Sequence, residues 1–310
     1  MNIIFFGTSD FGIPSLQALK KDHSLMAVVT TPDKPSGRGL ERQPSKVKRW
    51  ARSNQIPCFD YSREDPATLL TELKKIRPDL FVVISFGAIL KSDYLTAPRL
   101  YSLNVHGSLL PKYRGAAPMQ YALLNGDRQT GVSVIRMIER LDAGDILLQK
   151  ATPVAVDENL PQLEKRLSVM GAEAILEGIR MLEMGHAQFT VQAETQVSLA
   201  KKISKNDGRL DWKHTSRQIH DRIRAFVGWP GSYFFFRKKR IIVWEAEVAT
   251  GPFAATTPGA VAETSSTGLV VAAGMSTWIR LKKLQLEGKK PLEWKEFKKG
   301  FPLKVGDVLE

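Results

Sequence analysis

The sequence has few of the features that mark secreted, metal-binding or membrane proteins. It has 310 residues and a single cysteine, Cys58, so no disulfide can form within the chain. Its five histidines are scattered and do not show the spacing of metal ligands. The longest apolar stretches, such as 80–90, fall well short of the roughly 18 residues that a membrane-spanning helix needs. We therefore expect no metal site and no membrane span.

The first residues do not resemble a secretion signal, so we expect none. The first residues, MNIIFFGTSD, carry no basic leader, and Asp10 interrupts the apolar run before it becomes long. Together with the single cysteine, this predicts a cytoplasmic protein. The composition, with 43% hydrophobic and 25% charged residues, is that of a globular protein long enough for two hydrophobic cores. Nothing in the sequence requires a protein partner, so we expect a monomer.

The chain is strongly basic, and its charge is unevenly placed. Of the net +13, residues 190–310 carry +9, with 21 Lys and Arg against 12 Asp and Glu. Residues 33–49 hold six basic and two acidic side chains, which accounts for the remaining +4. Concentrated positive charge favours a polyanionic partner, because binding phosphates releases counterions. A solvated basic face that aids solubility is the other interpretation, and charge alone leaves both open.

The first half of the chain alternates short apolar runs with segments of helical periodicity. This rhythm predicts an α/β domain with a Rossmann-like parallel sheet, whose strands are apolar throughout because helices cover both faces. The predicted strands are 2–6, 25–30, 80–85, 103–106, 131–138 and 145–156, and the predicted helices are 13–21, 65–75, 117–124 and 160–184.

Periodicity is lost from about residue 191 to residue 206, where the sequence becomes polar. We therefore predict a domain at 1–189, a linker at 190–206 and a second domain at 207–310. After one short helix at 215–226, the second domain contains short β-type segments separated by turn signals, one of them the wholly basic turn 237–240. This pattern predicts a small β-barrel similar to the oligonucleotide-binding (OB) fold.

A glycine-containing turn, Gly7 to Gly12, follows the first predicted strand. A dinucleotide-binding fingerprint would stand here, but Ser9 replaces the second glycine of G-x-G-x-x-G, which lets the backbone approach a pyrophosphate. The turn therefore indicates a tight strand-to-helix connection, and a dehydrogenase is disfavoured.

Asn104 and His106 stand two positions apart at the end of a predicted strand. Their side chains then point the same way, at the carboxyl edge where open α/β sheets place ligands. A neutral amide donor beside a titratable imidazole suits the stabilisation of an oxyanion during acyl transfer. On spacing alone, a buried histidine with satisfied hydrogen bonds is the more common explanation, so spacing leaves the catalytic interpretation open.

Residues 104–118 read N-x-H-x-S-L-L-P-x-Y-R-G-A-A-P, which resembles the signature of the folate-dependent formyltransferases. The G-A-A-P-x-Q part resembles in particular the branch that acts on methionyl-tRNA. Further resemblances run along nearly the whole chain: F-x-G-T-x-x-F at 5–11, P-D-K-P-x-G-R-G at 32–39, S-F-G-A-I-L at 85–90, L-D-A-G-D at 141–145 and I-R-A-F with W-P at 223–230. Ordered motifs of this combined length are highly specific.

The resemblance implies an enzyme that transfers the formyl group of 10-formyltetrahydrofolate to the α-amino group of initiator methionyl-tRNA, for translation initiation. Asn104 and His106 would polarise the formyl oxygen, and Asp142 would order a water molecule and favour the cationic form of His106. From the residues alone, Asp142 and Asp145 are equal candidates, and the family motif selects Asp142. No metal is implied.

The resemblance also implies which residues hold the folate. The loop Ser108, Leu109, Leu110 and Pro111 would lie against it, and in the family the peptide bond before this proline is cis. Apolar and backbone groups of a second segment would line the pterin pocket, namely Phe86, Gly87, Ile89 and Leu90.

Two basic segments would contact the tRNA, according to the same resemblance. In the insertion after the second strand these are Arg38, Arg42 and Lys46, with Arg38 between two glycines expected to reach the acceptor end. In the second domain the basic turn would contact the tRNA body less specifically, through Arg237, Lys238, Lys239 and Arg240. Such contacts predict salt-sensitive binding.

Two other functions fit parts of the sequence. A formyltransferase acting on an amino-sugar nucleotide would share the catalytic motif, although the basic segments and G-A-A-P favour tRNA. A non-catalytic RNA-binding protein would need only the basic surface, and the presence of Asn104, His106 and Asp142 argues against it. Ser9 and Lys46 depart from the usual family pattern, which has proline at these places, and this affects the expected loop shape.

Overall fold

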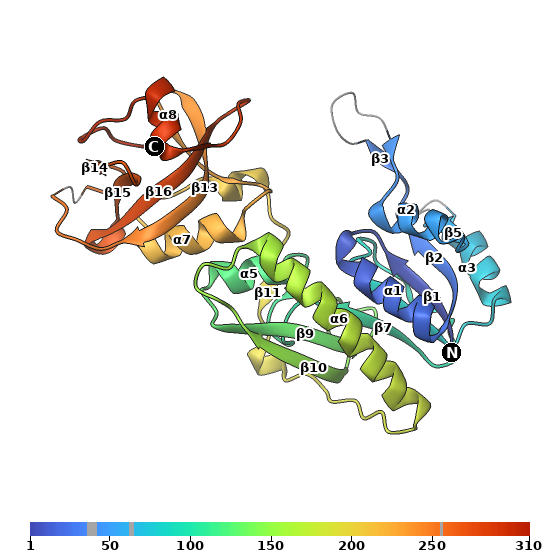
Figure 1. Cartoon of the computed structure of the whole chain (residues 1–310). Helices are drawn as coiled ribbons and strands as arrows, with labels where there is room; N and C mark the ends of the chain where they lie inside the picture. Colours follow the sequence, from blue (N-terminus) through green and yellow to red (C-terminus); the bar gives the residue numbers. More distant parts are fainter. Residues whose placement is uncertain (36–41, 62–64, 255–256) are drawn as a thin grey trace. The chain divides into compact units, whose positions relative to one another are not determined.

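A computed structural model describes residues 1–35, 42–61, 65–254 and 257–310 of the chain. These residues form two compact units (Figure 1). The first comprises Met1–Pro118, Gln129–Pro153 and Glu164–Ala200, and the second comprises Met119–Arg128, Val154–Leu163 and Lys201–Glu310. The domain limits inferred from the sequence stay a prediction. In the parts of the chain described, no helix is long and apolar enough to cross a membrane.

The first unit is built on a seven-stranded sheet with the strand order β10-β9-β7-β6-β1-β2-β5. Its strands are β1 (Asn2–Gly7), β2 (Ser24–Thr30), β5 (Cys58–Asp60), β6 (Leu80–Ile84), β7 (Tyr101–His106), β9 (Gln129–Arg136) and β10 (Ile146–Pro153). The five strands from β7 to β5 are parallel, which confirms the predicted α/β sheet. β9 is antiparallel to β7 and β10 is antiparallel to β9, a direction that the periodicity does not specify.

Helices cover both faces of this sheet. They are α1 (Ile13–Asp22), α2 (Lys46–Ser53), α3 (Pro66–Lys75), α4 (Ser92–Leu95) and most of α6 (Leu160–Glu183), with 3-10 turns η1 (Asp10–Gly12) and η2 (Glu194–Gln196). Phe5 and Phe6 point to opposite faces of β1, and both are fully buried. Phe6 packs with Leu70 and Leu73 of α3, while Phe5 lies against Gly12 at the start of α1. Burial of both faces is the reason that these strands are apolar at every position.

The long helix α6 packs on the end of the sheet formed by β7, β9 and β10 (Figure 1). A side chain at Gly171 would lie 3.0 Å from Val105 of β7, and one at Gly178 would lie 3.0 Å from Leu147 of β10. The helix therefore approaches these strands closely where it has glycine. Val105 points toward α6, so its neighbours Asn104 and His106 point to the opposite face.

Two short strand pairs add loops to the first unit. β3 (Lys34–Pro35) pairs with β4 (Arg42–Gln43) in an antiparallel ladder, and β8 (Arg114–Gly115) pairs in parallel with β11 (Leu199–Ala200). The second pair brings the end of the first unit's chain back to the loop that follows β7. It fixes the segment around Tyr113, which lies next to the candidate active site.

The second unit is an antiparallel barrel. Its strands β12 (Ser232–Phe236), β13 (Lys239–Ala249), β16 (Thr277–Leu286), β15 (Leu269–Ala273) and β14 (Val261–Thr264) are neighbours in this order, and β17 (Leu292–Glu293) also pairs with β16. The tail joins the two edges, because Phe235 of β12 exchanges hydrogen bonds with Glu310 at 2.7 and 2.9 Å, while Val261 of β14 donates to the Asp307 carbonyl at 2.8 Å. This closure confirms the predicted small β-barrel.

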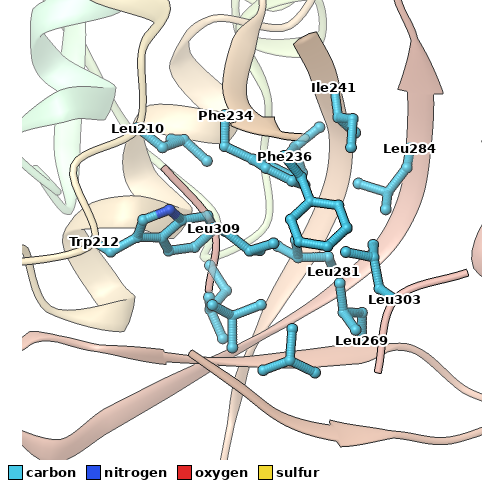
Figure 2. Packing of buried hydrophobic residues seen from close by; sticks show 14 of the residues in the cluster. Leu210, Trp212, Phe234, Phe236, Ile241, Leu269, Leu281, Leu284, Leu303 and Leu309 are labelled. Atoms are coloured by element: carbon cyan, nitrogen blue, oxygen red, sulfur yellow. The ribbon is translucent and has the colours of Figure 1, made fainter. Parts of the chain in front are cut away.

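Aromatic and branched side chains fill the barrel (Figure 2). Figure 2 shows Trp212, Phe234 and Phe236 packed among leucines of β15, β16 and the tail, and Phe234 is fully buried. The helices of this unit are α5 (Pro118–Leu124), which belongs to it from Met119 onward, α7 (Ser216–Ala225) and α8 (Trp294–Gly300), with η3 (Lys205–Gly208) and η4 (Gly274–Ser276). A capping box formed by Thr215 and Gln218 starts α7.

Helix α7 also holds the two earlier segments of the second unit. The buried Arg224 guanidinium donates to the carbonyls of Glu158 at 3.1 Å and Leu123 at 3.4 Å, and it pairs with Asp221 at 2.7 Å. Burial raises the pKa of Asp221, but hydrogen bonds from His220 and Arg224 outweigh it, and the pKa is lowered overall. Residues 119–128 and 154–163 are thus attached to the barrel by a charged side chain whose hydrogen bonds are satisfied.

Candidate active site

Three polar side chains converge at the carboxyl end of β7. Asn104 and His106 extend from the same face of the strand, and Asp142 approaches them from the loop between β9 and β10. The Asn104 Nδ2 amide lies 3.5 Å from Asp142 Oδ1, and His106 Nδ1 lies 3.6 Å from Asp142 Oδ2. All three are largely buried, with exposed fractions of 9% for Asn104 and 6% for His106.

The backbone around Tyr113 orients two of these groups. His106 Nε2 lies 2.9 Å from the Tyr113 carbonyl, and since a carbonyl only accepts, this nitrogen carries a hydrogen. The Gly115 N–H donates to Asp142 Oδ2 at 2.9 Å. His106 therefore turns Nδ1 toward Asp142, and the carboxylate has a fixed backbone donor.

The two candidate aspartates, Asp142 and Asp145, have different surroundings. Asp145 pairs with Arg136, and its carbonyl accepts from the Arg136 N–H at 2.9 Å, whereas Asp142 is the aspartate that lies near His106. Gly144 is required between them, because a Cβ there would lie 1.7 Å from the Arg136 carbonyl oxygen. Asp142 itself has φ +50, a conformation that non-glycine residues rarely adopt and that often marks functional loops.

The Ser108 to Pro111 loop follows directly and is held by β9 and β10. The Leu110–Pro111 peptide bond is cis, which confirms the prediction made from the family motif. Ser133 of β9 donates to the Ser108 carbonyl at 2.6 Å and accepts from the Leu110 N–H at 3.0 Å, and Gln149 of β10 donates to the Leu110 carbonyl at 2.9 Å. Ser108 and Leu110 are buried, whereas Leu109 and Pro111 are partly exposed.

The segment after β6 would form the opposite wall of the expected folate site. Phe86 and Leu90 are buried in the sheet core, while Gly87 is exposed and Ile89 is 72% exposed. Gly87 has φ +77, and the Thr8 hydroxyl donates to the Phe86 carbonyl at 2.9 Å, which ties the turn to β1. Of the four residues expected to line a pterin pocket, two therefore pack inward and two present surface.

Exposed apolar side chains lie on this segment and on the loop that carries Asp142. Ile89, Ile138 and Leu141 are 72%, 45% and 61% exposed, and the two loops are joined by the Ser92 N–H, which donates to Glu139 at 3.1 Å. Exposed apolar side chains of this size often mark a surface that binds a ligand or another protein. Among the described residues, no group of three or more His, Cys, Asp and Glu could hold a metal ion.

The basic residues predicted to contact tRNA have different surroundings. Arg42 of β4 is exposed, Lys46 at the start of α2 pairs with Asp10, and Arg38 lies outside the described residues. Arg237, Lys238 and Lys239 are exposed at the β12–β13 turn, as predicted for a turn, while Arg240 is half-buried over the Tyr233 ring and pairs with Glu287 at 3.1 Å. The two basic segments belong to different units.

One member of the basic insertion is not a surface cation. The Lys48 ammonium is buried and lies 2.8 Å from both Asp33 and Asp60. Burial lowers its pKa, but the hydrogen bonds and charges of the two aspartates outweigh burial and raise the pKa overall. Charge counted from the sequence therefore overstates the basic surface at this insertion.

Sequence reasoning did not single out several residues that shape the site. Tyr113 and Gly115 lie within the recognised motif, so the motif itself carried a signal for them. Ser133, Gln149 and Gln192 stand in segments interpreted as strand or linker, and a lone polar residue there gives no signal of what it binds.

Comparison with known proteins shows which family the chain resembles. Residues 1–179 match the formyl transferase family model and residues 202–302 match the formyl transferase C-terminal domain. The chain is 40% identical over 294 residues to a methionyl-tRNA formyltransferase of Anaeromyxobacter dehalogenans, which covers 93% of both chains. It is 37% identical over 310 residues to the methionyl-tRNA formyltransferase of Citrifermentans bemidjiense, covering 100% of this chain and 96% of the relative.

Solved structures show the same fold at lower identity. The structure of an N-formyltransferase from Helicobacter canadensis in complex with folinic acid and dTDP-3-aminofucose has a TM-score of 0.66 at 20% identity, covering 90% of this chain and 98% of that one. With both of its domains matched by family models and with full-length relatives, the chain belongs to the formyl transferase family.

Proposed function

We propose that the chain transfers the formyl group of 10-formyltetrahydrofolate to the α-amino group of initiator methionyl-tRNA. The observation that carries the proposal is the convergence of Asn104 and His106 on Asp142 beside two loops with exposed apolar groups. The substrate follows from the full-length relatives with this activity in their names. The proposal places the chain in the cytoplasm, where it acts as a monomer without a metal.

The reaction needs stabilisation of one negative and one positive charge. The neutral α-amine attacks the formyl carbon, which produces an oxyanion on the formyl oxygen and an ammonium on the attacking nitrogen. The Asn104 amide has two hydrogens, so one can donate to Asp142 and the other to the oxyanion. Asp142, through a water molecule, accepts the proton of the ammonium, and the proton passes to the departing folate nitrogen.

His106 supplies the second donor. Its Nε2–H is engaged by the Tyr113 carbonyl, so Nδ1 is the nitrogen that faces the reacting group. At 3.6 Å, the separation of Nδ1 from Asp142 Oδ2 exceeds a hydrogen bond, which leaves room for the cationic Nδ1–H to reach the formyl oxygen.

The folate would lie between the two loops. Leu109 and Pro111 of the cis-proline loop and Gly87 and Ile89 of the opposite wall present surface to it. Ser108, Leu110, Phe86 and Leu90 are buried and act by fixing the shape of these walls. A flat pterin ring between apolar side chains and backbone amides suits this arrangement.

The tRNA would contact both basic segments. In the barrel, Lys238 and Lys239 are exposed and form no ion pair among the residues that the structure describes, so the β12–β13 turn offers charge to phosphates. By contrast, Lys282 and Lys283 of β16 already pair with Glu247 and Glu245. The β12–β13 turn is therefore the part of the barrel that would contact the tRNA. In the insertion, Arg42 and Arg38 would contact it.

One assay separates this function from the amino-sugar alternative. Purified protein is incubated with formyl-labelled 10-formyltetrahydrofolate and either initiator methionyl-tRNA or a dTDP-amino sugar. We expect label to appear on the aminoacyl-tRNA and not on the sugar nucleotide, and to be lost in Asp142→Asn. Transfer to the sugar nucleotide alone would reject the proposed substrate, and transfer to neither would reject a formyltransferase.

A further inference from the structure

A buried arginine–glutamine pair contacts the backbone of the loop that carries Asp142. Arg114, between Tyr113 and Gly115, is 5% exposed, and Gln192 is 4% exposed. The guanidinium donates through Nε at 3.0 Å and Nη2 at 2.8 Å to the same atom, Gln192 Oε1. Both residues belong to the first unit, although 78 positions separate them in the sequence.

The amide nitrogen of Gln192 binds the catalytic loop. Gln192 Nε2 donates to the carbonyls of Asp142 at 2.8 Å and Gly144 at 2.7 Å. These bonds use both amide hydrogens, so the polar atoms of the side chain are fully engaged. The glutamine therefore holds the backbone of Asp142, which has φ +50 and needs its surroundings to keep that conformation.

The two residues next to Arg114 in the sequence contact His106 and Asp142. Its neighbour Tyr113 accepts from His106 Nε2, and its neighbour Gly115 donates to Asp142 Oδ2. Tyr113 has φ +64 and Gly115 has φ +127, so this segment also lies in an unusual conformation. The Arg114–Gln192 pair thus connects the backbone that orients His106 with the backbone that orients Asp142.

An exposed glutamate balances the buried charge of Arg114. Glu194 accepts from Arg114 at 3.0 Å and pairs with Arg140, and the hydrogen bonds from these two arginines lower its pKa. Glu194 therefore stays ionised over a wide pH range. A buried guanidinium requires such a partner, which explains how Arg114 is tolerated behind the site.

We propose that Gln192 is a positioning residue: by bonding the carbonyls of residues 142 and 144 while accepting from Arg114, it sets the placement of Asp142 against His106 and Asn104. This inference rests on the proposed function. It assigns Gln192 an effect on the chemical step and not on the binding of either substrate. Misplacement of a catalytic group by about 1 Å can reduce a rate by about a hundredfold.

Two substitutions separate this role from simple packing around Arg114. Gln192→Met keeps the approximate volume and loses every hydrogen bond. Gln192→Glu keeps an acceptor for Arg114, but its oxygens cannot donate to the two carbonyls. If the contact with the loop matters, both variants lose activity; if Gln192 only satisfies Arg114, the glutamate variant remains active.

A matched control exists in the barrel. Gln285 accepts from the Trp244 indole N–H at 2.7 Å and donates to the Lys289 carbonyl at 2.6 Å, so Gln285→Met removes the same kinds of bonds away from the candidate site residues. Each variant is tested for folding by circular dichroism and melting temperature. Formyl transfer is then measured at varied concentrations of 10-formyltetrahydrofolate and methionyl-tRNA.

We expect kcat to fall about 10- to 100-fold in Gln192→Met and Gln192→Glu, with both KM values within about threefold of wild type. Gln285→Met should keep the wild-type kcat. A Gln192→Glu kcat within twofold of wild type, or a loss confined to KM, would overturn the positioning role while leaving the proposed function intact. Absence of transfer by the wild-type chain would instead overturn the proposed function and this inference with it.

Discussion

The three catalytic candidates are held in different ways. Asn104 and His106 are fixed by β7, whose neighbours β6 and β9 are paired on both sides, so their positions follow from the sheet. Asp142 is on a loop and depends on separate contacts from Gly115 and Gln192. Substitutions in the loop are therefore expected to affect geometry, whereas substitutions on the strand remove the donor itself.

Removal of the amide tests the donor role. In Asn104→Ala one oxyanion donor is lost, which typically costs about 100- to 1000-fold in rate. We expect kcat to fall by that factor, measured as initial rates of formyl-methionyl-tRNA production. The melting temperature should change little, because the one side-chain hydrogen bond of Asn104 to the described residues is the long one to Asp142, at 3.5 Å. Activity within tenfold of wild type would contradict the assignment.

Lys48 provides a prediction about stability. In Lys48→Met, Asp33 and Asp60 lose their common cation, and hydrogen bonds to charged groups contribute about 1.5–3 kcal/mol. We expect the free energy of unfolding, measured in urea at pH 7, to fall by about 1–3 kcal/mol. The exposed pair of Lys46 with Asp10 serves as the comparison, and Lys46→Met should cost less than about 1 kcal/mol.

The pH dependence of this effect follows from the sign of the shift. The pKa of Lys48 is raised in the folded state above its ordinary value of 10.5. The ion pairs therefore stabilise the fold fully below the unfolded pKa, and this stabilisation is lost as pH rises through the folded pKa. The difference between wild type and Lys48→Met should be constant from neutral pH to about pH 10 and shrink above it. A difference that widened above pH 10 would contradict the ion-pair origin.

At the scale of elements, the β12–β13 hairpin places exposed basic residues in a turn whose backbone conformation is unfavourable for them. Its two turn residues, Arg237 and Lys238, have φ +49 and φ +59, as a tight two-residue turn requires, although glycine or asparagine is usual there. The Arg237 guanidinium lies 4.8 Å from the Phe236 ring centre, which gives some compensation. Basic residues at such positions are more easily explained by binding than by folding.

A glycine in this turn separates the two effects. Lys238→Gly relieves a left-handed conformation that costs other residues about 1 kcal/mol and removes one exposed cation. We expect an unchanged or higher melting temperature together with a higher KM for methionyl-tRNA. The KM for 10-formyltetrahydrofolate should stay constant. An unchanged KM for tRNA would exclude this turn from the RNA contact.

At the scale of the whole molecule, the net charge of +13 overstates the cations available for binding. Lys48 is buried, Lys282 and Lys283 pair with glutamates, and Lys299 pairs with Glu296. What stays exposed includes Arg42 in the first unit and the β12–β13 turn in the second. A polyanion that binds both units would thus meet cations on separate parts of the chain.

Salt dependence tests this distributed binding. Each phosphate contact contributes to the slope of log affinity against log salt, so several contacts give a steep fall. We expect the KM for methionyl-tRNA to rise steeply with potassium chloride, and kcat at saturating tRNA to change little. Lys238→Gly should reduce the slope by about one. A salt-independent KM would contradict docking through phosphates.

Much of the fold could be predicted from local pattern. The apolar runs at β1, β2, β6 and β7 and the periodicity of α1, α3 and α6 report burial directly, because the sheet is covered on both faces. Helix α2 and strand β5 were not predicted, because α2 is rich in Lys and Arg and β5 is only three residues long. The antiparallel direction of β9 depends on pairing with β7 and leaves no trace in its own pattern.

For the site, the sequence by itself determined that Asn104 and His106 share a strand face, since two-residue spacing in an extended chain fixes this. The family motif added the cis peptide bond before Pro111, which the structure confirms, and the catalytic role of Asp142, which stays a prediction. Only the tertiary structure decided that Asp145 turns to Arg136, that Lys48 is an internal ion pair and that Gln192 binds the Asp142 loop. Some of these contacts join residues that are distant in the chain, and others depend on the path that a loop takes. Neither residue type nor spacing in the sequence encodes which partner a buried polar group meets.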